Sequence, residues 1–147
     1  MEIREATIAD LAAIMEIENA CFETDAWSES VMSSELKARH TNYILGLENQ
    51  QVIGYAGLSK LPLMDQADIQ TIAISPQYRS KGFGRILMQF LLAKAKELGA
   101  AEVFLEVRAD NLAAQKLYES LGFTQIGIRK HYYQPDDVDA IVMRADV

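Results

Sequence analysis

The amino-acid sequence predicts an α/β fold in which a mixed β-sheet carries helices on both of its faces. Segments with helical periodicity alternate with short β-branched runs, in the order two helices, three strands, helix, strand, helix and two strands. The chain has 147 residues, of which 50% are hydrophobic and 24% charged, and this mixture is typical of a globular domain that buries its own core. Because no repeat, low-complexity tract or linker interrupts it, we expect residues 1–147 to form a single domain.

The first two helices are predicted from their capping residues. Residues 7–10, Thr-Ile-Ala-Asp, form a capping box with Asp in place of the usual Glu, and apolar residues continue at helical spacing as far as Phe22. Ser28 is placed to cap a second helix that carries Val31, Met32 and Leu36.

The period then changes to that of β-strands. Thr41–Glu48 and Gln51–Leu61 are predicted as the strands of a hairpin that the pair Asn49-Gln50 closes. Asp68–Ile74 is predicted as a third strand, because it is nearly continuous in β-branched residues.

In the second half of the chain, helices and strands alternate. Apolar residues recur at helical spacing from Ile86 to Leu98, and Gly99 is well placed to end this helix. The remaining predicted elements are a strand over Glu102–Val107, a helix that Asn111 caps and Gly122 ends, and two strands over Phe123–Arg129 and Val138–Arg144.

The charge of the chain limits its partners. Fourteen Lys and Arg against 21 Asp and Glu give a net charge of −7, which repels a nucleic-acid backbone unless the basic residues cluster. The nearest cluster, Arg79, Lys81 and Arg85, is too small to coat a duplex but large enough for a small phosphorylated ligand. We therefore expect no nucleic-acid partner.

The location of the protein is predicted from two further features. No apolar run reaches the roughly 18–20 residues of a membrane span, and the first residues lack a signal-peptide pattern, so no membrane association is expected. The single cysteine, Cys21, cannot form an internal disulfide, which is typical of the reducing cytoplasm, and we expect it to be a buried structural thiol.

The loop Arg79–Arg85 lies between a predicted strand and a predicted amphipathic helix. A helix N-terminus presents unpaired N–H groups and a partial positive charge, and adjacent glycines let the backbone approach an anion closely. The loop lacks the Gly-Lys-Ser/Thr of a Walker A motif and the third glycine of a dinucleotide fingerprint. It predicts a phosphate or pyrophosphate site, and a plain tight turn into a helix is the alternative.

Glu106 is a carboxylate inside a strongly apolar strand. Alternation places it with Phe104 and Arg108 on one face of that strand. Partial desolvation raises the pKa of a carboxylate and makes it an effective proton acceptor, so a catalytic role is one interpretation. The other is an ion pair with Arg108 that makes Glu106 purely structural.

Tyr118 lies on the predicted helix that follows. A phenol is protonated at neutral pH and can donate a proton to a departing thiolate. A helical tyrosine near leucines is more often a packing residue, so this segment alone favours packing. The two histidines have no metal-ligand spacing, and no metal site is predicted.

Together, the strand ending at Ile74, the Arg79–Gly84 loop and the segment from Asn111 to Phe123 resemble the GNAT family of acetyl-CoA-dependent N-acetyltransferases, over essentially the whole chain. Within that family, the segments Phe22–Ser28, Phe104–Arg108 and Arg129–Ala140 are similar to the bacterial ribosomal-protein-alanine N-acetyltransferases. One departure is Ala26, where proline usually precedes Trp27. The resemblance implies a central, mostly antiparallel sheet, acetyl-CoA as cosubstrate and no metal, and the N-terminal alanine of a small-subunit ribosomal protein as acceptor.

The resemblance also implies roles for individual residues. The implied cofactor-binding residues are the pantetheine-binding Ile72, Ala73 and Ile74, the pyrophosphate-binding Arg79, Ser80, Lys81, Gly82, Phe83, Gly84 and Arg85, and Asn111. Glu106 is the implied general base and Tyr118 the implied general acid for direct attack of the amine in a ternary complex, without an acyl-enzyme.

Acceptor choice is expected to depend on the Phe22–Trp27 and His131–Asp137 loops. Phe22, Trp27, Tyr132 and Tyr133 are therefore the predicted acceptor-binding residues, although the two tyrosines could instead cover the sheet edge. Acetylation of lysine side chains or of a small amine, a non-catalytic acetyl-CoA-binding regulator and a cofactor-free interaction module are the competing interpretations.

Overall fold

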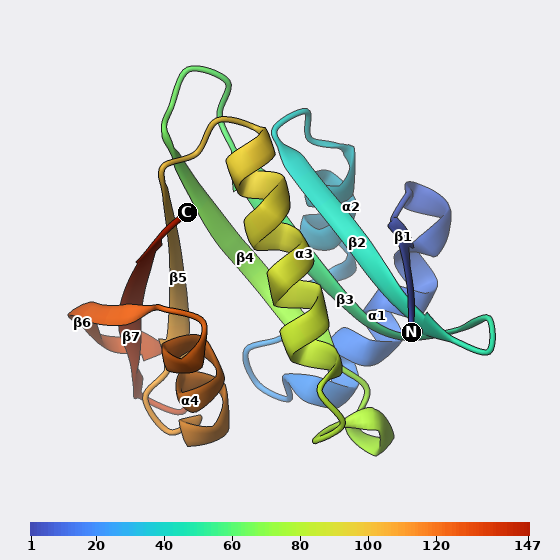
Figure 1. Cartoon of the computed structure of the whole chain (residues 1–147). Helices are drawn as coiled ribbons and strands as arrows, with labels where there is room; N and C mark the ends of the chain where they lie inside the picture. Colours follow the sequence, from blue (N-terminus) through green and yellow to red (C-terminus); the bar gives the residue numbers. More distant parts are fainter.

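The structure, a computed structural model, describes all residues from 1 to 147 (Figure 1). Its helices and strands are, in chain order, β1 (Glu2–Glu5), α1 (Leu11–Cys21), α2 (Glu29–Lys37), β2 (Thr41–Glu48), β3 (Gln51–Lys60), β4 (Gln66–Ile74), α3 (Phe83–Glu97), β5 (Glu102–Arg108), α4 (Leu112–Ser120), β6 (Thr124–Tyr133) and β7 (Val138–Asp146). None of the helices is both long and apolar enough to cross a membrane.

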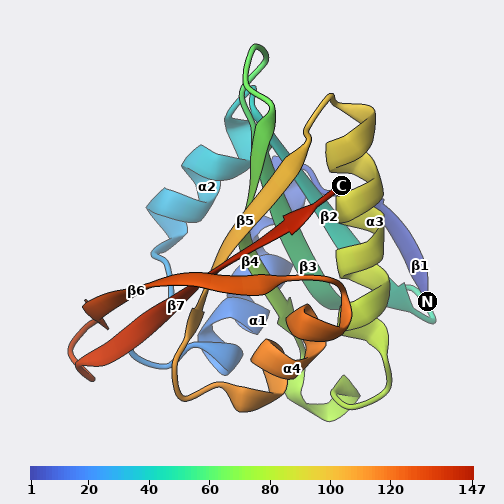
Figure 2. The same ribbon diagram turned by 60° about the vertical axis from the view of Figure 1, so that its left-hand side comes forward.

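The seven strands form one sheet in the order β1-β2-β3-β4-β5-β7-β6. All neighbouring strands are antiparallel except β4 and β5, which are parallel. Figures 1 and 2 show α3 lying along one face of the sheet, with α1 and α2 on the other. The predicted fold class, a mixed and mostly antiparallel sheet with helices on both faces, is confirmed.

Each face of the sheet has its own apolar core. On one face, α3 and α4 contribute buried side chains that include Leu87, Leu91 and Tyr118. On the other, Ile14 and Ile17 of α1 and Met32 of α2 pack against strands β2 and β3. The sheet is therefore held between two layers of helices, which fixes the positions of its strands.

The capping residues behave as the sequence predicts. The Thr7 and Asp10 side chains form the reciprocal capping box at a short 3₁₀ turn that leads into α1. The Ser28 hydroxyl accepts from the N–H of Val31, and the Asn111 side chain accepts from the N–H of Ala114. Each bond satisfies a helix donor that has no intrahelical partner.

The hairpin turn between β2 and β3 is also confirmed. Asn49 and Gln50 both have positive φ, 49° and 68°, as the two central residues of a type I′ turn require. This turn has the backbone twist that matches the right-handed twist of the two strands it joins.

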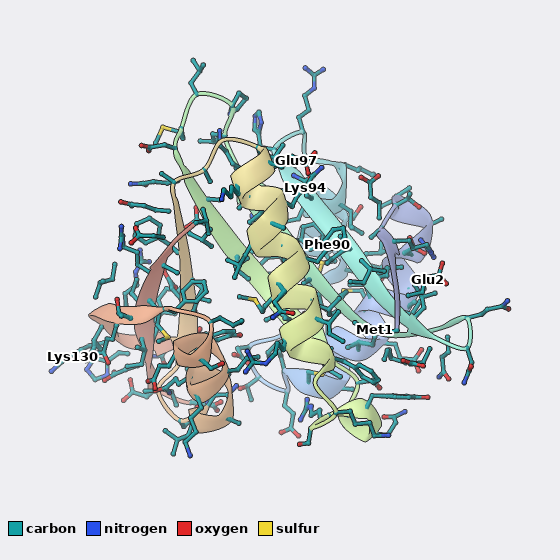
Figure 3. All side chains as sticks on the ribbon, in the orientation of Figure 1. Met1, Glu2, Phe90, Lys94, Glu97 and Lys130 are labelled. Carbon is teal, nitrogen blue, oxygen red and sulfur yellow. The ribbon has the colours of Figure 1, made fainter.

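Two strand assignments differ from the sequence predictions. Strand β1 was not predicted, because Glu2–Glu5 has too few apolar residues to show alternation. It adds to the edge of β2, where the Met1 amino group lies 3.1 Å from the Glu48 carboxylate. Figure 3 shows Met1 and Glu2 here, and Lys130 on β6 at the opposite edge of the sheet.

The second difference concerns β6. The prediction that Tyr132 and Tyr133 lie in a loop is wrong, since β6 continues to Tyr133, which pairs with Val138. A register irregularity between Arg129 and Tyr133 interrupts the ladder, and His131 within it has φ of 58°. Such a bulge hides the two-residue alternation that would identify a strand.

The parallel strands β4 and β5 separate soon after they meet. They pair only at Gln66–Asp68 and Glu102–Phe104, and Figure 1 shows the two strands diverging beyond these residues. In β4, the pairing with β3 shifts register at Gln70, and this bulge bends the strand at the point where the separation begins. Residues 69–74 of β4 therefore have no strand neighbour on the β5 side.

Candidate active site

Three adjoining cavities lie along the separation between β4 and β5. We call them the loop-side cavity, next to Arg79–Arg85, the central cavity, and the ribbon-side cavity, next to the β6–β7 ribbon; their volumes are about 620, 140 and 490 Å³. The loop-side and central cavities share Phe22, Ile72, Asn111 and Tyr118 as lining residues. The central and ribbon-side cavities share Trp27, Ile69, Gln70, Leu105, Glu106 and Tyr133. The three cavities therefore adjoin one another along this separation, and we refer to them together as the channel.

The N-terminus of α3 forms one wall of the loop-side cavity. Gly82, with φ of 85°, is the N-cap residue, and no side chain accepts from the first N–H groups of the helix. Ser80 also has a positive φ, of 62°. Residues that alternate between left-handed and right-handed backbone conformations direct their N–H groups toward one point and so form a concave anion site. The helix dipole adds positive potential to it. The geometry fits the predicted pyrophosphate site.

The three cations of this loop have different partners. The Arg79 Nε donates to the carbonyl of Ile74 at 3.2 Å, and the Arg85 guanidinium donates to the Ser120 hydroxyl at 2.6 Å. Lys81 is exposed, with its Nζ 5.5 Å from the centroid of the Tyr78 ring. The two arginines thus join the loop to β4 and α4, while Lys81 remains available to an anion.

The rest of the loop-side cavity fits an extended ligand chain. The unpaired edge of β4 provides Ile72, Ala73 and Ile74 as lining residues. Asn111 lies across the channel, and because its side-chain oxygen caps α4, its amide nitrogen remains free to donate to a ligand. At Gly84 in α3, an added Cβ would lie 3.5 Å from Leu117 and 3.9 Å from Ile74, so the first turn of α3 lies in van der Waals range of both α4 and β4.

Glu106 lies where the central and ribbon-side cavities meet. Its carboxylate is 3.2 Å from the guanidinium of Arg129, whereas Arg108 pairs with Asp25, Asp110 and Asp136. Of the two interpretations left open by the sequence, the ion pair between Glu106 and Arg108 is therefore wrong. Because Arg129 is mostly exposed, it leaves the carboxylate accessible from the channel.

A second carboxylate, Asp68, lines the ribbon-side cavity near Glu106. Burial, and then the charge of Glu106, raise the pKa of Asp68. The same two causes raise the pKa of Tyr132, which lines the same cavity. Glu106 therefore exerts its charge on this end of the channel, which makes it favourable for a cation.

Tyr118 lies at the junction of the loop-side and central cavities. Its ring is buried and packs edge-on against Phe123, with the ring centroids 6.0 Å apart. Burial raises the pKa of Tyr118 to about 12, so the hydroxyl keeps its proton at neutral pH. Packing and an acid role, which the sequence presented as alternatives, are compatible because the ring is packed while the residue lines the channel.

The four predicted acceptor-binding residues all line the channel. Phe22 lines the loop-side and central cavities, Trp27 and Tyr133 the central and ribbon-side cavities, and Tyr132 the ribbon-side cavity. Burial is the largest cause that raises the pKa of Tyr133, followed by the charge of Glu106. Of the residues that the sequence predicted for the site, all but the exposed Lys81 line one of the three cavities.

Several lining residues were not predicted, and Glu18 is the most informative. This α1 residue is only 2% exposed, and its carboxylate accepts from the Tyr55 hydroxyl and, at 2.8 Å, from the N–H of Trp27. Burial raises the pKa of Glu18. A carboxylate within the apolar stripe of a helix was the signal in the sequence, because burying one requires partners.

Gln70 and Cys21 complete the unpredicted contacts. Gln70, at the bulge in β4, accepts from the Tyr43 hydroxyl at 2.8 Å and donates to Glu35 at 3.2 Å. Cys21 is only half-buried, so the expectation of a buried thiol is wrong; it lines the loop-side cavity, and its Sγ lies 3.3 Å from the carbonyl of Ile74. No three His, Cys, Asp or Glu side chains are grouped to hold a metal ion.

An anion site, a buried phenol and a carboxylate follow one another along a channel between two separating strands, an arrangement suited to transfer of a group from a phosphate-bearing donor. The chain belongs to the acetyltransferase (GNAT) family, whose sequence profile matches residues 11–123. It is 36% identical to the N-alpha-acetyltransferase RimI of Mycobacterium tuberculosis over 143 residues, which cover 95% of this chain and 89% of that protein.

Two solved structures extend the comparison. The ribosomal-protein-S18-alanine N-acetyltransferase of Escherichia coli superimposes with a TM-score of 0.91 and 33% identity, covering 99% of this chain and 93% of that one. The putative acetyltransferase yncA from Salmonella typhimurium, described with its cofactor acetyl-CoA, has a TM-score of 0.83 and 26% identity, covering 99% of this chain and 93% of that one.

Proposed function

We propose that this acetyltransferase transfers the acetyl group of acetyl-CoA to the α-amine of the N-terminal alanine of a small-subunit ribosomal protein. The observation that carries the proposal is the single channel joining the anion site at the start of α3 to Glu106 and Tyr118, and then to the aromatic ribbon-side cavity. The names of the relatives in M. tuberculosis and E. coli support the α-amine and the ribosomal acceptor.

The loop-side cavity is the proposed binding site for coenzyme A. The N–H groups from Ser80 to Arg85 and the Lys81 ammonium would bind the pyrophosphate, because this is where unpaired donors and positive charge coincide. The backbone of Ile72–Ile74 would bond the pantetheine arm as an added strand would, with Asn111 donating from the opposite wall. When bound, acetyl-CoA supplies an acetyl group activated as a thioester.

Glu106 is the proposed general base. An α-amine has a pKa of about 7.7–8.0, so most of it is protonated at neutral pH and cannot attack a carbonyl. Glu106, directly or through a water molecule, would accept that proton at its carboxylate oxygen. Arg129, 3.2 Å away, holds the carboxylate without burying it, so the base stays in place and remains open to the acceptor.

Tyr118 is the proposed general acid. Its hydroxyl, protonated because burial raises its pKa to about 12, would donate its proton to the sulfur as the thiolate leaves. A backbone N–H near Ile74 would donate to the thioester carbonyl, a contribution typically worth about 3–4 kcal/mol. With acid and base on separate walls of the central cavity, amine and thioester would react directly in a ternary complex.

The experiment is incubation of the protein with acetyl-CoA and a lysine-free peptide that begins with alanine. Mass spectrometry should find one acetyl group on the α-amine, and a matched peptide with a blocked N-terminus should remain unmodified. A peptide with a blocked N-terminus and one internal lysine tests the alternative acceptor. Acetylation of only this third peptide, or consumption of acetyl-CoA with none of the three, would refute the proposal.

A further inference from the structure

Arg108, the last residue of β5, has an unusual concentration of acidic partners. Its guanidinium contacts Asp110 through two atoms at 3.0 Å, Asp136 at 3.3 Å and Asp25 at 3.5 Å. The same group lies 5.3 Å from the centroid of the Tyr133 ring. One cation therefore holds three carboxylates that would otherwise repel one another.

Two of these carboxylates belong to segments that are far apart in the chain. Asp25 lies in the connection between α1 and α2, and Asp136 lies in the turn between β6 and β7. The Thr24 hydroxyl also donates to Asp136 at 2.5 Å, so the two segments touch directly. They are joined at the rim of the central cavity, which Asp25 and Arg108 both line.

The joined segments carry the aromatic side chains of the acceptor end. Phe22 and Trp27 lie on either side of Asp25, and Tyr133 immediately precedes the turn that contains Asp136. From the inside, Glu18 accepts from the N–H of Trp27. The α1–α2 connection is thus held from inside by a buried carboxylate and from outside by Arg108.

Arg108 itself is fixed by the sheet. It pairs with Ala140 in the β5–β7 ladder, and the Gln115 amide of α4 donates to the carbonyls of Arg108 and Ala109 at 3.0 and 3.1 Å. The Arg108 side chain is only 20% exposed, and its planar guanidinium fork can bond several carboxylates at once. A lysine ammonium would keep the charge but lose that fork.

We propose that Arg108 is a positioning residue for the acceptor: by bonding Asp25 and Asp136 together, it sets the distance between Phe22 and Trp27 on one segment and Tyr133 on the other. Arg108 takes no proton in the reaction and does not contact Glu106. This inference rests on the proposed function, because it assigns these segments to the acceptor rather than to coenzyme A. Loss of the ion pairs through which Arg108 joins Asp25 to Asp136 should weaken acceptor binding and leave cofactor binding intact.

The test compares Arg108→Gln with Arg144→Gln. Arg144 of β7 also bonds two carboxylates, Glu102 at 3.0 Å and Asp146 at 2.5 Å, but it lies toward the other end of the β5–β7 ladder and lines none of the three cavities of the channel. The two variants therefore lose the same charge and similar ion pairs. The KM for an alanine-terminated peptide, the KM for acetyl-CoA, kcat and the melting temperature are measured for each.

We expect Arg108→Gln to raise the KM for the peptide about ten-fold or more, since small displacements of positioning groups carry large costs, with the KM for acetyl-CoA within about two-fold of wild type. Arg108→Lys should recover part of the loss. Arg144→Gln should change the melting temperature without separating the two KM values. Equal changes in both KM values for Arg108→Gln, or no change in either, would overturn the proposal.

A second measurement does not require turnover. Trp27 is the only tryptophan, so quenching of its fluorescence by acrylamide reports how open the α1–α2 connection is. Quenching should increase in Arg108→Gln, Asp25→Asn and Asp136→Asn but not in Arg144→Gln. Unchanged quenching in the first three variants would refute the proposal that Arg108 holds the two segments together. If the wild-type enzyme acetylates no N-terminal peptide, the proposed function fails. The quenching measurement still shows in that case whether Arg108 holds the two segments together.

Discussion

Replacement of the Tyr118 hydroxyl provides a sharp test of the proposed chemistry, because the structure separates its effect on stability from its effect on rate. The ring of Tyr118 packs against Phe123, and Tyr118→Phe keeps that packing. No group of the protein forms a hydrogen bond with the Tyr118 hydroxyl, which is not a buried unpartnered atom, so no hydrogen bond is lost in the variant. We expect the free energy of unfolding to change by less than about 1 kcal/mol.

The effect on rate should be much larger. General acid catalysis contributes about 10²–10⁴ to turnover, or about 2.7–5.4 kcal/mol of activation free energy at 1.36 kcal/mol per factor of ten. Because burial raises the pKa of Tyr118 to about 12, the acid stays protonated and the wild-type rate should show no alkaline fall below about pH 10.

The assay follows release of the coenzyme A thiol with an alanine-terminated peptide at saturating acetyl-CoA. Calorimetry of acetyl-CoA binding and a thermal melt serve as controls and should match the wild type within about two-fold and about 4 °C. A variant that keeps its kcat within a few-fold would remove Tyr118 from the mechanism. A large loss of melting temperature would show instead that the hydroxyl is structural.

Four further changes test other parts of the reasoning. Glu106→Gln should lower kcat/KM at pH 7 by about 10²–10⁴, and the loss should shrink above the α-amine pKa of about 7.7–8.0, where the acceptor is already deprotonated; a loss of less than about ten-fold at pH 7 would place the base elsewhere, on Asp68 or water. Asp68→Asn should lower kcat/KM by less than about ten-fold if Glu106 is the base, because a carboxylate remains in the cavity; an effect as large as that of Glu106→Gln would identify Asp68 as the base. Gly57→Ala should destabilise the protein by about 1–3 kcal/mol in denaturant titrations, because the new Cβ would lie 2.3–2.8 Å from atoms of the Tyr43 ring, and an unchanged midpoint would contradict this packing. Glu18 has a raised pKa in the folded state, so the stability it contributes is fully present below its unfolded pKa of about 4.3 and is lost as the pH rises through the higher folded value. Glu18→Gln should therefore flatten the fall of unfolding free energy above pH 4, and an identical slope in both proteins would count against the burial of this charge.

The local elements of the fold follow from short-range rules, and for that reason the sequence predicts them well. Ser28 and Asn111 cap their helices because each side-chain oxygen finds a free N–H three residues ahead. Gly99 and Gly122 end helices with φ of 95° and 97°, a conformation that residues with a Cβ rarely adopt. β1 was missed because it forms only through its pairing with β2.

The site is predicted less completely than the fold. The Arg79–Arg85 loop, Glu106 and Tyr118 are recognisable because their residue types and spacing match those of an acetyltransferase. The sequence by itself left their roles open, above all whether Glu106 pairs with Arg108. The partner of Glu106 is Arg129, which lies 23 positions away on another strand, and no local pattern predicts such a contact.

By itself, the sequence determined the order of helices and strands, their caps and turns, and the loop that presents N–H groups at the start of α3, because each depends on residues within a few positions of one another. Only the tertiary structure decided where β4 and β5 separate, that three cavities join there, and that Arg108 holds Asp25 and Asp136 together. These features depend on strand register and on contacts between side chains more than 25 positions apart in the sequence. Such contacts form only when the whole chain packs, so no local pattern in the sequence predicts them.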